Sequence, residues 1–325
     1  MFFDVNSSDA RFTGRWSVDE NSAVTTAPGS YFELAVSGKF AVLHFDMTYS
    51  TPPYQHLWIC VDDGAKIEVP LDRVIRIEMK ENTRHIITVT YKGSVEIQHR
   101  WYLPLVGRID FRGVETEAIS ILPRDERKVI EFIGDSITEG VLIDAQYEFE
   151  KEGQLNRPNQ DDSTATYAYL TAQRLDMIPL IMGYGGTGVT RGGCGGVPKA
   201  SLSYGYNFDG SEKNTPKPHI IVINYGANDV RNGAQCYIES YREFLSIVRV
   251  DNPNAKIVVL SPFCGAYAAE LDTLVREFNL QNKDNIAFIN SSGWVEAEPL
   301  HPTRESHMKL AEYLSERLTE LLKEE

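Results

Sequence analysis

The sequence predicts two domains of different class, an antiparallel β-sandwich over residues 1–123 and a three-layer α/β domain with a parallel sheet over 127–325. The first third of the chain carries many short runs rich in Val, Ile, Phe and Tyr, with no helical pattern between them. Beyond residue 128, continuous apolar runs alternate with helical patterns, as in a parallel α/β domain. A charged segment led by a proline, residues 123–128, connects the two regions.

The runs of the first region predict the strands of the sandwich. Several alternate apolar and polar residues, which is typical of strands with one face buried. Turn signals such as Ser37-Gly38-Lys39 and Asp62-Asp63-Gly64 separate them. The expected strands lie at 31–38, 40–49, 56–63, 66–71, 74–79, 84–92, 95–103 and 107–122.

The second region predicts five strands that are covered on both faces, because their apolar runs are continuous rather than alternating. These runs lie at 128–133, 178–182, 220–225, 256–261 and 285–290, and helices are expected at 163–175, 236–249, 267–280 and 303–323. The last helix has apolar residues at helical spacing, including Leu310, Leu314 and Leu318.

Composition excludes several classes of protein. With 42% hydrophobic and 24% charged residues, the 325-residue chain has the composition of a soluble globular protein. Its formal charge of −14 argues against partners that are nucleic acids or anionic membranes, because both require a positive protein surface. No apolar stretch approaches the roughly 20 residues of a membrane span, and no signal peptide is visible, so we expect a cytoplasmic protein.

Four polar segments stand next to strands of the second region. Gly134-Asp135-Ser136 follows the first strand, 183–188 follows the second, 226–229 follows the third, and 298–303 precedes the last helix. In an open parallel sheet, ligands bind at the carboxyl ends of the strands. Gly-Asp-Ser alone is also ordinary turn and N-cap chemistry, but together the four segments predict one site on one rim of the sheet.

In these segments the sequence resembles the SGNH (GDSL) hydrolase superfamily of esterases and lipases, over about residues 128–325. The resemblance implies a flavodoxin-like domain in which Ser136 is the nucleophile and His301 is its general base. It also implies an oxyanion hole made by the backbone N–H groups of Ser136 and Gly186 and the side-chain amide of Asn228, with Gly188 as the alternative to Gly186.

The chemistry of these residues agrees with those roles. A serine hydroxyl is a weak nucleophile and needs an adjacent base to take its proton. A histidine titrates near neutral pH, so it can accept that proton and return it to the leaving alcohol. The tetrahedral oxyanion needs fixed donors, and an asparagine amide is a donor that does not titrate.

The sequence departs from the family pattern at one position. The family usually has Asp three residues before the histidine, whereas this chain has Glu298. Glu298 is therefore the candidate third catalytic residue. The alternatives are that a main-chain carbonyl or Glu296 orients His301 instead.

The glycine-rich segment after the second α/β strand also fits a dinucleotide-binding motif in part. Gly183, Gly185 and Gly188 satisfy the spacing of a dinucleotide fingerprint, but the segment that follows, 190–198, cannot begin a helix. No phosphate loop and no zinc-binding pattern is present, so we expect neither cofactor nor metal. Trp294 lies in the same loop as His301, where it could stack on a sugar ring or pack into the protein.

The order of the two domains indicates a resemblance to one particular group within this superfamily. The segments RFTGRW, PGSYFEL and RKVIEFIGDSITEG resemble the two-domain carbohydrate esterases of family two, in which a jelly-roll domain precedes the SGNH domain. This implies an esterase that removes O-acetyl groups from saccharides, with an oligosaccharide ester as its substrate. Two other functions stay open: a lipid esterase, lysophospholipase or thioesterase, and a glycan-binding protein without catalysis. The oligomeric state is not indicated.

Overall fold

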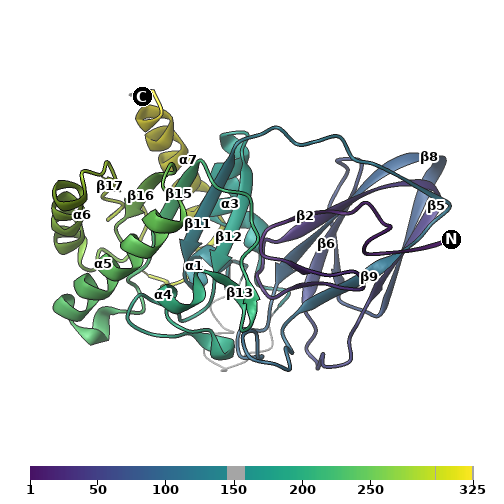
Figure 1. Cartoon of the computed structure of the whole chain (residues 1–325), viewed down its shortest axis with the longest axis horizontal. Helices are drawn as coiled ribbons and strands as arrows, with labels where there is room; N and C mark the ends of the chain where they lie inside the picture. The colour runs from purple at the N-terminus through teal and green to yellow at the C-terminus, as the bar shows by residue number, and fades with distance from the viewer. Residues whose placement is uncertain (145–157, 297, 324–325) are drawn as a thin grey trace.

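An antiparallel-sheet domain and a parallel α/β domain lie side by side along the longest axis of the molecule (Figure 1). The computed structural model describes residues 1–144, 158–296 and 298–323. Residues 145–157, 297 and 324–325 lie outside the described residues. Within the described ranges, no helix combines the length and the hydrophobicity needed to cross a membrane.

The first domain is built from antiparallel strands that form one hydrogen-bonded sheet around an apolar core. Phe32, Leu34, Val89 and Phe111 lie in that core and are almost completely buried. The strands are β1 (Phe2–Asp4), β2 (Arg11–Thr13), β3 (Ser17–Val18), β4 (Ala23–Thr25), β5 (Tyr31–Phe45), β6 (His56–Val61), β7 (Ile67–Pro70), β8 (Val74–Gly93), β9 (Ile109–Glu115) and β10 (Ala118–Ser120). The antiparallel class is as predicted, whereas the jelly-roll connection pattern stays a prediction.

Two expected turns are absent from this domain. The runs 31–38 and 40–49 belong largely to the single strand β5, and 74–79 and 84–92 belong to β8. The two long strands pair along most of their length, with a register shift between Gly38 and Phe40. Gly38 pairs with Thr83 and Phe40 pairs with Glu78, so residues 79–82 of β8 lie opposite Lys39 alone. The predicted turn at 37–39 is therefore an irregularity in the strand pairing that does not end β5.

The strand predicted at 95–103 is wrong. This segment has no regular secondary structure. Its Trp101 packs into a core cluster of the α/β domain, whereas Ile97 and Leu103 are exposed. Arg100 beside Trp101 is completely buried.

The second domain has a parallel five-stranded sheet in the order β12-β11-β15-β16-β17. Its strands are β11 (Val129–Gly134), β12 (Ile178–Gly183), β15 (Ile220–Asn224), β16 (Lys256–Leu260) and β17 (Ala287–Ile289). In chain order this is 2-1-3-4-5, the flavodoxin-like arrangement, and all five strands lie where the sequence predicts them. A short hairpin, β13 (Tyr206–Phe208) and β14 (Ser211–Glu212), stands apart from the sheet.

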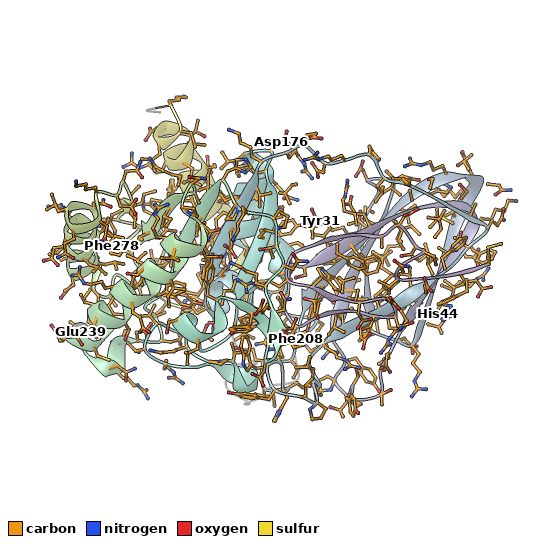
Figure 2. All side chains as sticks on the ribbon, viewed as in Figure 1. Tyr31, His44, Asp176, Phe208, Glu239 and Phe278 are labelled. Atoms are coloured by element: carbon orange, nitrogen blue, oxygen red, sulfur yellow. The ribbon has the colours of Figure 1, made fainter. Side chains whose placement is uncertain are left out.

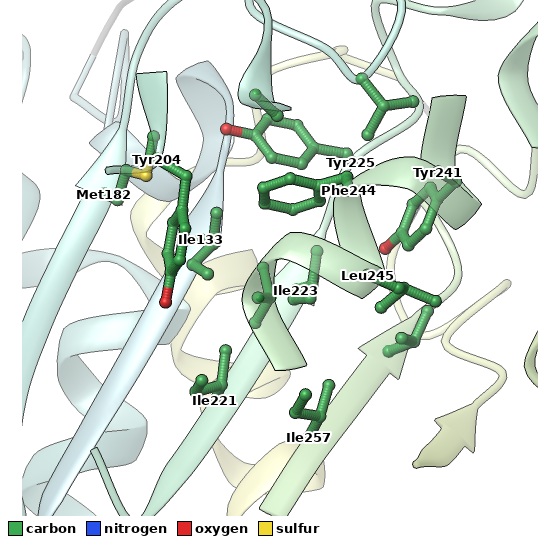
Figure 3. Packing of buried hydrophobic residues seen from close by; sticks show 14 of the residues in the cluster. Ile133, Met182, Tyr204, Ile221, Ile223, Tyr225, Tyr241, Phe244, Leu245 and Ile257 are labelled. Carbon is green, nitrogen blue, oxygen red and sulfur yellow. The ribbon is translucent and has the colours of Figure 1, made fainter. Parts of the chain in front are cut away.

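Helices cover both faces of this sheet. They are α1 (Ser136–Glu139), α3 (Tyr167–Arg174), α4 (Ala200–Ser203), α5 (Ala234–Asp251), α6 (Ala268–Asn282) and α7 (Arg304–Leu321), with single 3-10 turns at Ser163–Ala165, Cys194–Gly196 and Val230–Asn232. Alternate residues of each strand point to opposite faces. Thus Ile221 and Ile223 of β15 share a core cluster with Phe244 of α5 (Figure 3), while Ile220 and Val222 join the cluster of α3 and α7.

Polar contacts join the two domains along their boundary, near which Tyr31 and Phe208 lie (Figure 2). Arg15, which follows β2, forms an ion pair with Glu131 of β11, with Nη2 3.2 Å from Oε1. The two side chains are only 2% and 1% exposed. Arg15 Nη1 also donates to the Tyr204 carbonyl at 3.0 Å, and the Tyr204 hydroxyl donates to Glu131 Oε2 at 3.0 Å. Such a pair needs both members, because either charge alone would be buried without compensation.

We expect the Arg15→Met substitution to lower the free energy of unfolding by about 3–5 kcal/mol, since it leaves the Glu131 carboxylate buried and unpaired. Urea unfolding followed by tryptophan fluorescence measures this change. The control is Arg11→Met, which removes a pair with Glu33 whose side chains are 30% and 17% exposed, and which should cost at most about 1 kcal/mol. Equal losses in the two variants would contradict the expectation.

Candidate active site

The candidate nucleophile lies at the point where the order of the sheet reverses. β11 ends at Gly134, and Ser136 is the first residue of α1, directly after it. A Cβ atom on residue 134 would lie 2.1 Å from Thr138 Oγ1 and 2.9 Å from the Asn224 carbonyl, so only glycine fits this tight exit from the strand. Asp135 caps α1 by accepting a hydrogen bond from the Ile137 N–H at 3.0 Å. The turn therefore fixes the backbone of Ser136.

The structure brings together Ser136 and His301, the predicted nucleophile and its predicted general base. His301 Nε2 lies 3.0 Å from Ser136 Oγ, although the residues are 165 positions apart in the chain. His301 stands two residues before Thr303, the N-cap of α7, whose side chain accepts a hydrogen bond from the Ser306 N–H. Ser136 is 7% exposed, and His301 is half-buried. A neutral imidazole in this position can accept the proton of the serine hydroxyl.

Of the two glycines considered for the second oxyanion donor, one is already engaged. The Gly188 N–H donates to the Arg191 carbonyl at 3.0 Å. The Gly186 N–H has no acceptor among the residues that the structure describes. This difference favours Gly186 as the donor.

The amide of Asn228 lies between two segments: the loop that follows β12, residues 184–190 (the glycine loop), and the turn at residues 134–137 that carries Ser136 (the serine turn). Its Nδ2 donates to the Thr187 carbonyl at 3.0 Å and to Asp135 Oδ2 at 3.3 Å. The neighbouring Asp229 is buried and accepts hydrogen bonds from the Thr190 N–H at 2.8 Å and the Thr190 hydroxyl at 2.5 Å. Asn228 and Asp229 therefore connect the glycine loop to the serine turn through hydrogen bonds. A substrate oxyanion would compete with the protein acceptors for the Asn228 hydrogens.

The carboxyl of Asp135 is the most perturbed acid of this region. Its pKa is raised to about 7, chiefly by burial and further by the nearby Asp229 and Glu139 carboxylates. A hydrogen bond from the Ile137 N–H acts in the opposite direction and lowers this pKa. Because this pKa lies above the ordinary value of 3.8, the protonated group stabilises the folded state at low pH. That contribution declines as the pH rises from about 3.8 through about 7.

In the described part of the chain, neither an ion pair nor a hydrogen bond joins Glu298 to His301. The Glu298 side chain is exposed. Glu296 is exposed as well, and residue 297 lies outside the described residues. The role of Glu298 as a third catalytic residue, and that of a main-chain carbonyl or Glu296 in its place, stay predictions.

Trp294 is half-buried and meets Tyr313 of α7 edge to face, with ring centroids 5.6 Å apart. It also packs against the core cluster of α3 and α7. At the same time it lines a cavity of about 500 Å³, together with Phe263, Cys264 and Lys309. One part of the ring therefore packs into the protein and another part faces a cavity, and contact with substrate stays a prediction.

Two buried residues next to the site were missed by the sequence analysis. Glu139, the last residue of α1, forms an ion pair with Arg100 of the first domain. Glu139 lies three residues after the predicted nucleophile Ser136, and Arg100 lies in the segment predicted as a strand. A charged Arg100 directly before Trp101 and Tyr102 could have suggested a buried arginine, but nothing in the sequence indicates that its partner is Glu139.

A serine whose hydroxyl contacts a histidine at the carboxyl edge of a flavodoxin-like sheet, next to backbone and amide donors, defines a serine hydrolase of the SGNH class. The chain belongs to the GDSL-like lipase/acylhydrolase family, whose model matches residues 132–309.

Relatives and a solved structure resemble the chain beyond this domain. It is 26% identical over 271 residues to an acetylxylan esterase/glucomannan deacetylase of Cellvibrio japonicus, covering 76% of this chain and 73% of that protein. It is 27% identical over 241 residues to the cellulase/esterase CelE of Acetivibrio thermocellus, covering 65% of this chain but only 28% of that longer protein. A family two carbohydrate esterase from Cellvibrio japonicus has the same two-domain fold, with a TM-score of 0.82 at 19% identity, covering 99% of this chain and 98% of that one.

We expect Ser136→Ala and His301→Ala each to lower kcat by several orders of magnitude, because each removes one member of the contacting pair. Hydrolysis of p-nitrophenyl acetate measures the loss, and circular dichroism checks that the variants are folded. Activity of Ser136→Ala within tenfold of the wild type would contradict the assignment of Ser136 as the nucleophile.

Glu298→Gln is expected to lower kcat by less than about tenfold, whereas loss of a carboxylate that orients a catalytic histidine costs about 10⁴. The physical reason is that Glu298 is exposed and makes no hydrogen bond to His301. The same ester assay decides the matter. A loss as large as that of His301→Ala would show that Glu298 orients the imidazole.

Proposed function

We propose that this protein is a serine esterase that removes O-acetyl groups from saccharides. The 3.0 Å contact between His301 Nε2 and Ser136 Oγ carries the proposal of ester hydrolysis. The saccharide part is supported by the relatives, one of which is named an acetylxylan esterase/glucomannan deacetylase, and by the shared two-domain fold.

In the first half of the reaction, His301 accepts the proton of Ser136 while Oγ attacks the acetyl carbonyl carbon. The negative charge that develops on the carbonyl oxygen is stabilised by the N–H groups of Ser136 and Gly186 and by the Asn228 amide. His301 then returns the proton to the sugar oxygen, the C–O bond breaks, and an acetyl-serine ester is left.

In the second half, His301 takes a proton from a water molecule, whose oxygen attacks the same carbonyl carbon. The second oxyanion occupies the same donors, and its collapse breaks the bond to Ser136 Oγ and releases acetate. Ser136 recovers its proton from His301, so the protein is unchanged after one cycle.

The test is acetate release from acetylated xylo-oligosaccharides, with the wild type and Ser136→Ala side by side. We expect release by the wild type alone, because only Ser136 has a base in contact with its hydroxyl among the candidate residues. p-Nitrophenyl acetate and p-nitrophenyl octanoate are assayed in parallel, and the acetyl ester should be strongly preferred.

The alternatives give different results in the same assay. Turnover of octanoate without release of acetate from sugars would keep the serine chemistry but assign it to a lipid esterase or a thioesterase. Binding of the oligosaccharide without turnover of any ester would leave a glycan-binding protein. Either result would contradict the proposed deacetylation.

A further inference from the structure

A buried ion pair crosses the boundary between the domains next to the candidate oxyanion hole. Arg100 of the first domain contacts Glu139 of α1 through Nη1 and Oε1, and the two side chains are 0% and 1% exposed. The Ser94 hydroxyl donates to the same Oε1 at 2.8 Å and accepts from Arg100 Nη1 at 2.9 Å. One oxygen of Glu139 is thus held by two residues that belong to the first domain.

The other oxygen of Glu139 holds the glycine loop. Oε2 accepts a long hydrogen bond from Arg100 Nη2 at 3.4 Å and a short one from the Gly185 N–H at 2.6 Å. This is shorter than the usual distance of about 2.9 Å between a backbone nitrogen and an acceptor oxygen, as expected when the acceptor is ionised. Arg100 places a positive charge directly against this buried carboxylate, which would otherwise lack a partner of opposite charge.

Gly185 is fixed at its carbonyl too. That oxygen accepts a hydrogen bond from the Cys194 N–H at 2.8 Å. The carbonyl of Gly185 and the N–H of Gly186 belong to one planar peptide group and point in opposite directions. Fixing the position of Gly185 and the direction of its carbonyl therefore aims the Gly186 N–H, the candidate oxyanion donor.

The segment that holds the carbonyl of Gly185 is itself attached to the first domain. The Arg100 N–H donates to the Gly195 carbonyl at 2.9 Å. Gly195 has a φ of +64°, and a Cβ atom there would lie 2.5 Å from the Gln98 carbonyl, so the two backbones approach as closely as glycine allows. Arg100 thus reaches the oxyanion loop by two routes, one through its side chain and one through its backbone.

We propose that Arg100 is a positioning residue for ester hydrolysis: through Glu139 and Gly185 it aligns the Gly186 N–H toward the substrate oxyanion. Arg100, a residue of the first domain, then contributes to catalysis through the glycine loop and not by contact with the reacting atoms. This inference rests on the proposed function, since it assigns Gly186 the role of a donor in that reaction.

The chain contains a matched control for this proposal. Arg15 and Glu131 form a second ion pair across the same boundary, with side chains that are 2% and 1% exposed. The second oxygen of Glu131 accepts from the Tyr204 hydroxyl, not from the glycine loop. Arg15→Met therefore removes the same chemistry from the same boundary without releasing Gly185.

The first measurement compares kcat and KM for p-nitrophenyl acetate in Arg100→Met, Arg100→Lys and Arg15→Met. Losing one oxyanion donor costs about 10²–10³ in kcat, so a donor that is only misaligned should cost about tenfold to a hundredfold. We expect this loss in Arg100→Met, with KM changed less than about threefold, because binding of the ground state does not use the oxyanion donors. Arg100→Lys should recover part of kcat, and Arg15→Met should keep the wild-type value.

The second measurement observes the Gly185 amide proton directly by NMR and does not depend on activity. Labelling tyrosine carbonyl carbons with ¹³C and glycine nitrogens with ¹⁵N selects the Tyr-Gly pairs, which are 184–185, 204–205 and 225–226 in this sequence. The Gly185 proton should resonate far downfield in the wild type, because its acceptor is a carboxylate. It should move upfield in Arg100→Met and in Glu139→Gln and stay in place in Arg15→Met, with Gly226 as the internal reference, because the carbonyl before it accepts from the Tyr237 hydroxyl and from neither arginine.

The outcomes separate this inference from the proposed function. An upfield shift of Gly185 together with a loss of kcat in Arg100→Met, both absent in Arg15→Met, supports the positioning role. An unchanged Gly185 signal, or equal kcat in the two variants, overturns it. If Arg100→Met does not fold, Arg100→Lys and Glu139→Gln are judged by the same two criteria. If the wild type releases no acetate from sugars, the proposed substrate fails, while the Gly185 signal and the p-nitrophenyl acetate assay still decide the role of Arg100.

Discussion

The contact between Ser136 and His301 depends on the order of the parallel sheet. The chain leaves β11 in the interior of the sheet, crosses to β12 on one side and then returns to β15 on the other. Loops that follow β11 and β15 therefore diverge at their exits and leave room for a ligand between them. Ser136, the glycine loop and Asn228 all stand at these exits, and the segment before α7 delivers His301 to the same rim. No local motif could produce this arrangement without the strand order.

Burial of charge is the second constraint on the molecule. Glu131 and Glu139 belong to the α/β domain, yet the arginines that balance them, Arg15 and Arg100, come from the antiparallel domain. An ionised carboxylate without a partner is costly inside a protein. The α/β domain therefore carries all the candidate catalytic residues in its own sequence, but Glu131 and Glu139 are balanced by arginines of the first domain.

The sequence predicted most of the fold because strong local patterns agree with the tertiary structure. Continuous apolar runs located the five parallel strands, and the polar segments after them located the rim of the site. The segment 95–103 was wrong because its alternating pattern is that of a half-buried strand, whereas Trp101 and Arg100 face a different domain. The pairing of Arg100 with Glu139 joins residues 39 positions apart, and no periodicity encodes such a contact. The sequence likewise could not choose between Gly186 and Gly188 as the oxyanion donor, because the choice depends on the hydrogen bond from the Gly188 N–H to the Arg191 carbonyl, which only the structure shows.

The two pairs of opposite charge at the boundary bear on how such proteins change in evolution. A recombination event that joins the first domain of one relative to the second domain of another separates each arginine from the carboxylate with which it was selected. The product would fold well only if both parents kept the same residues at both boundary positions. The two halves of this chain are therefore expected to be inherited as one unit, unlike domains joined by a simple linker, which can be exchanged freely.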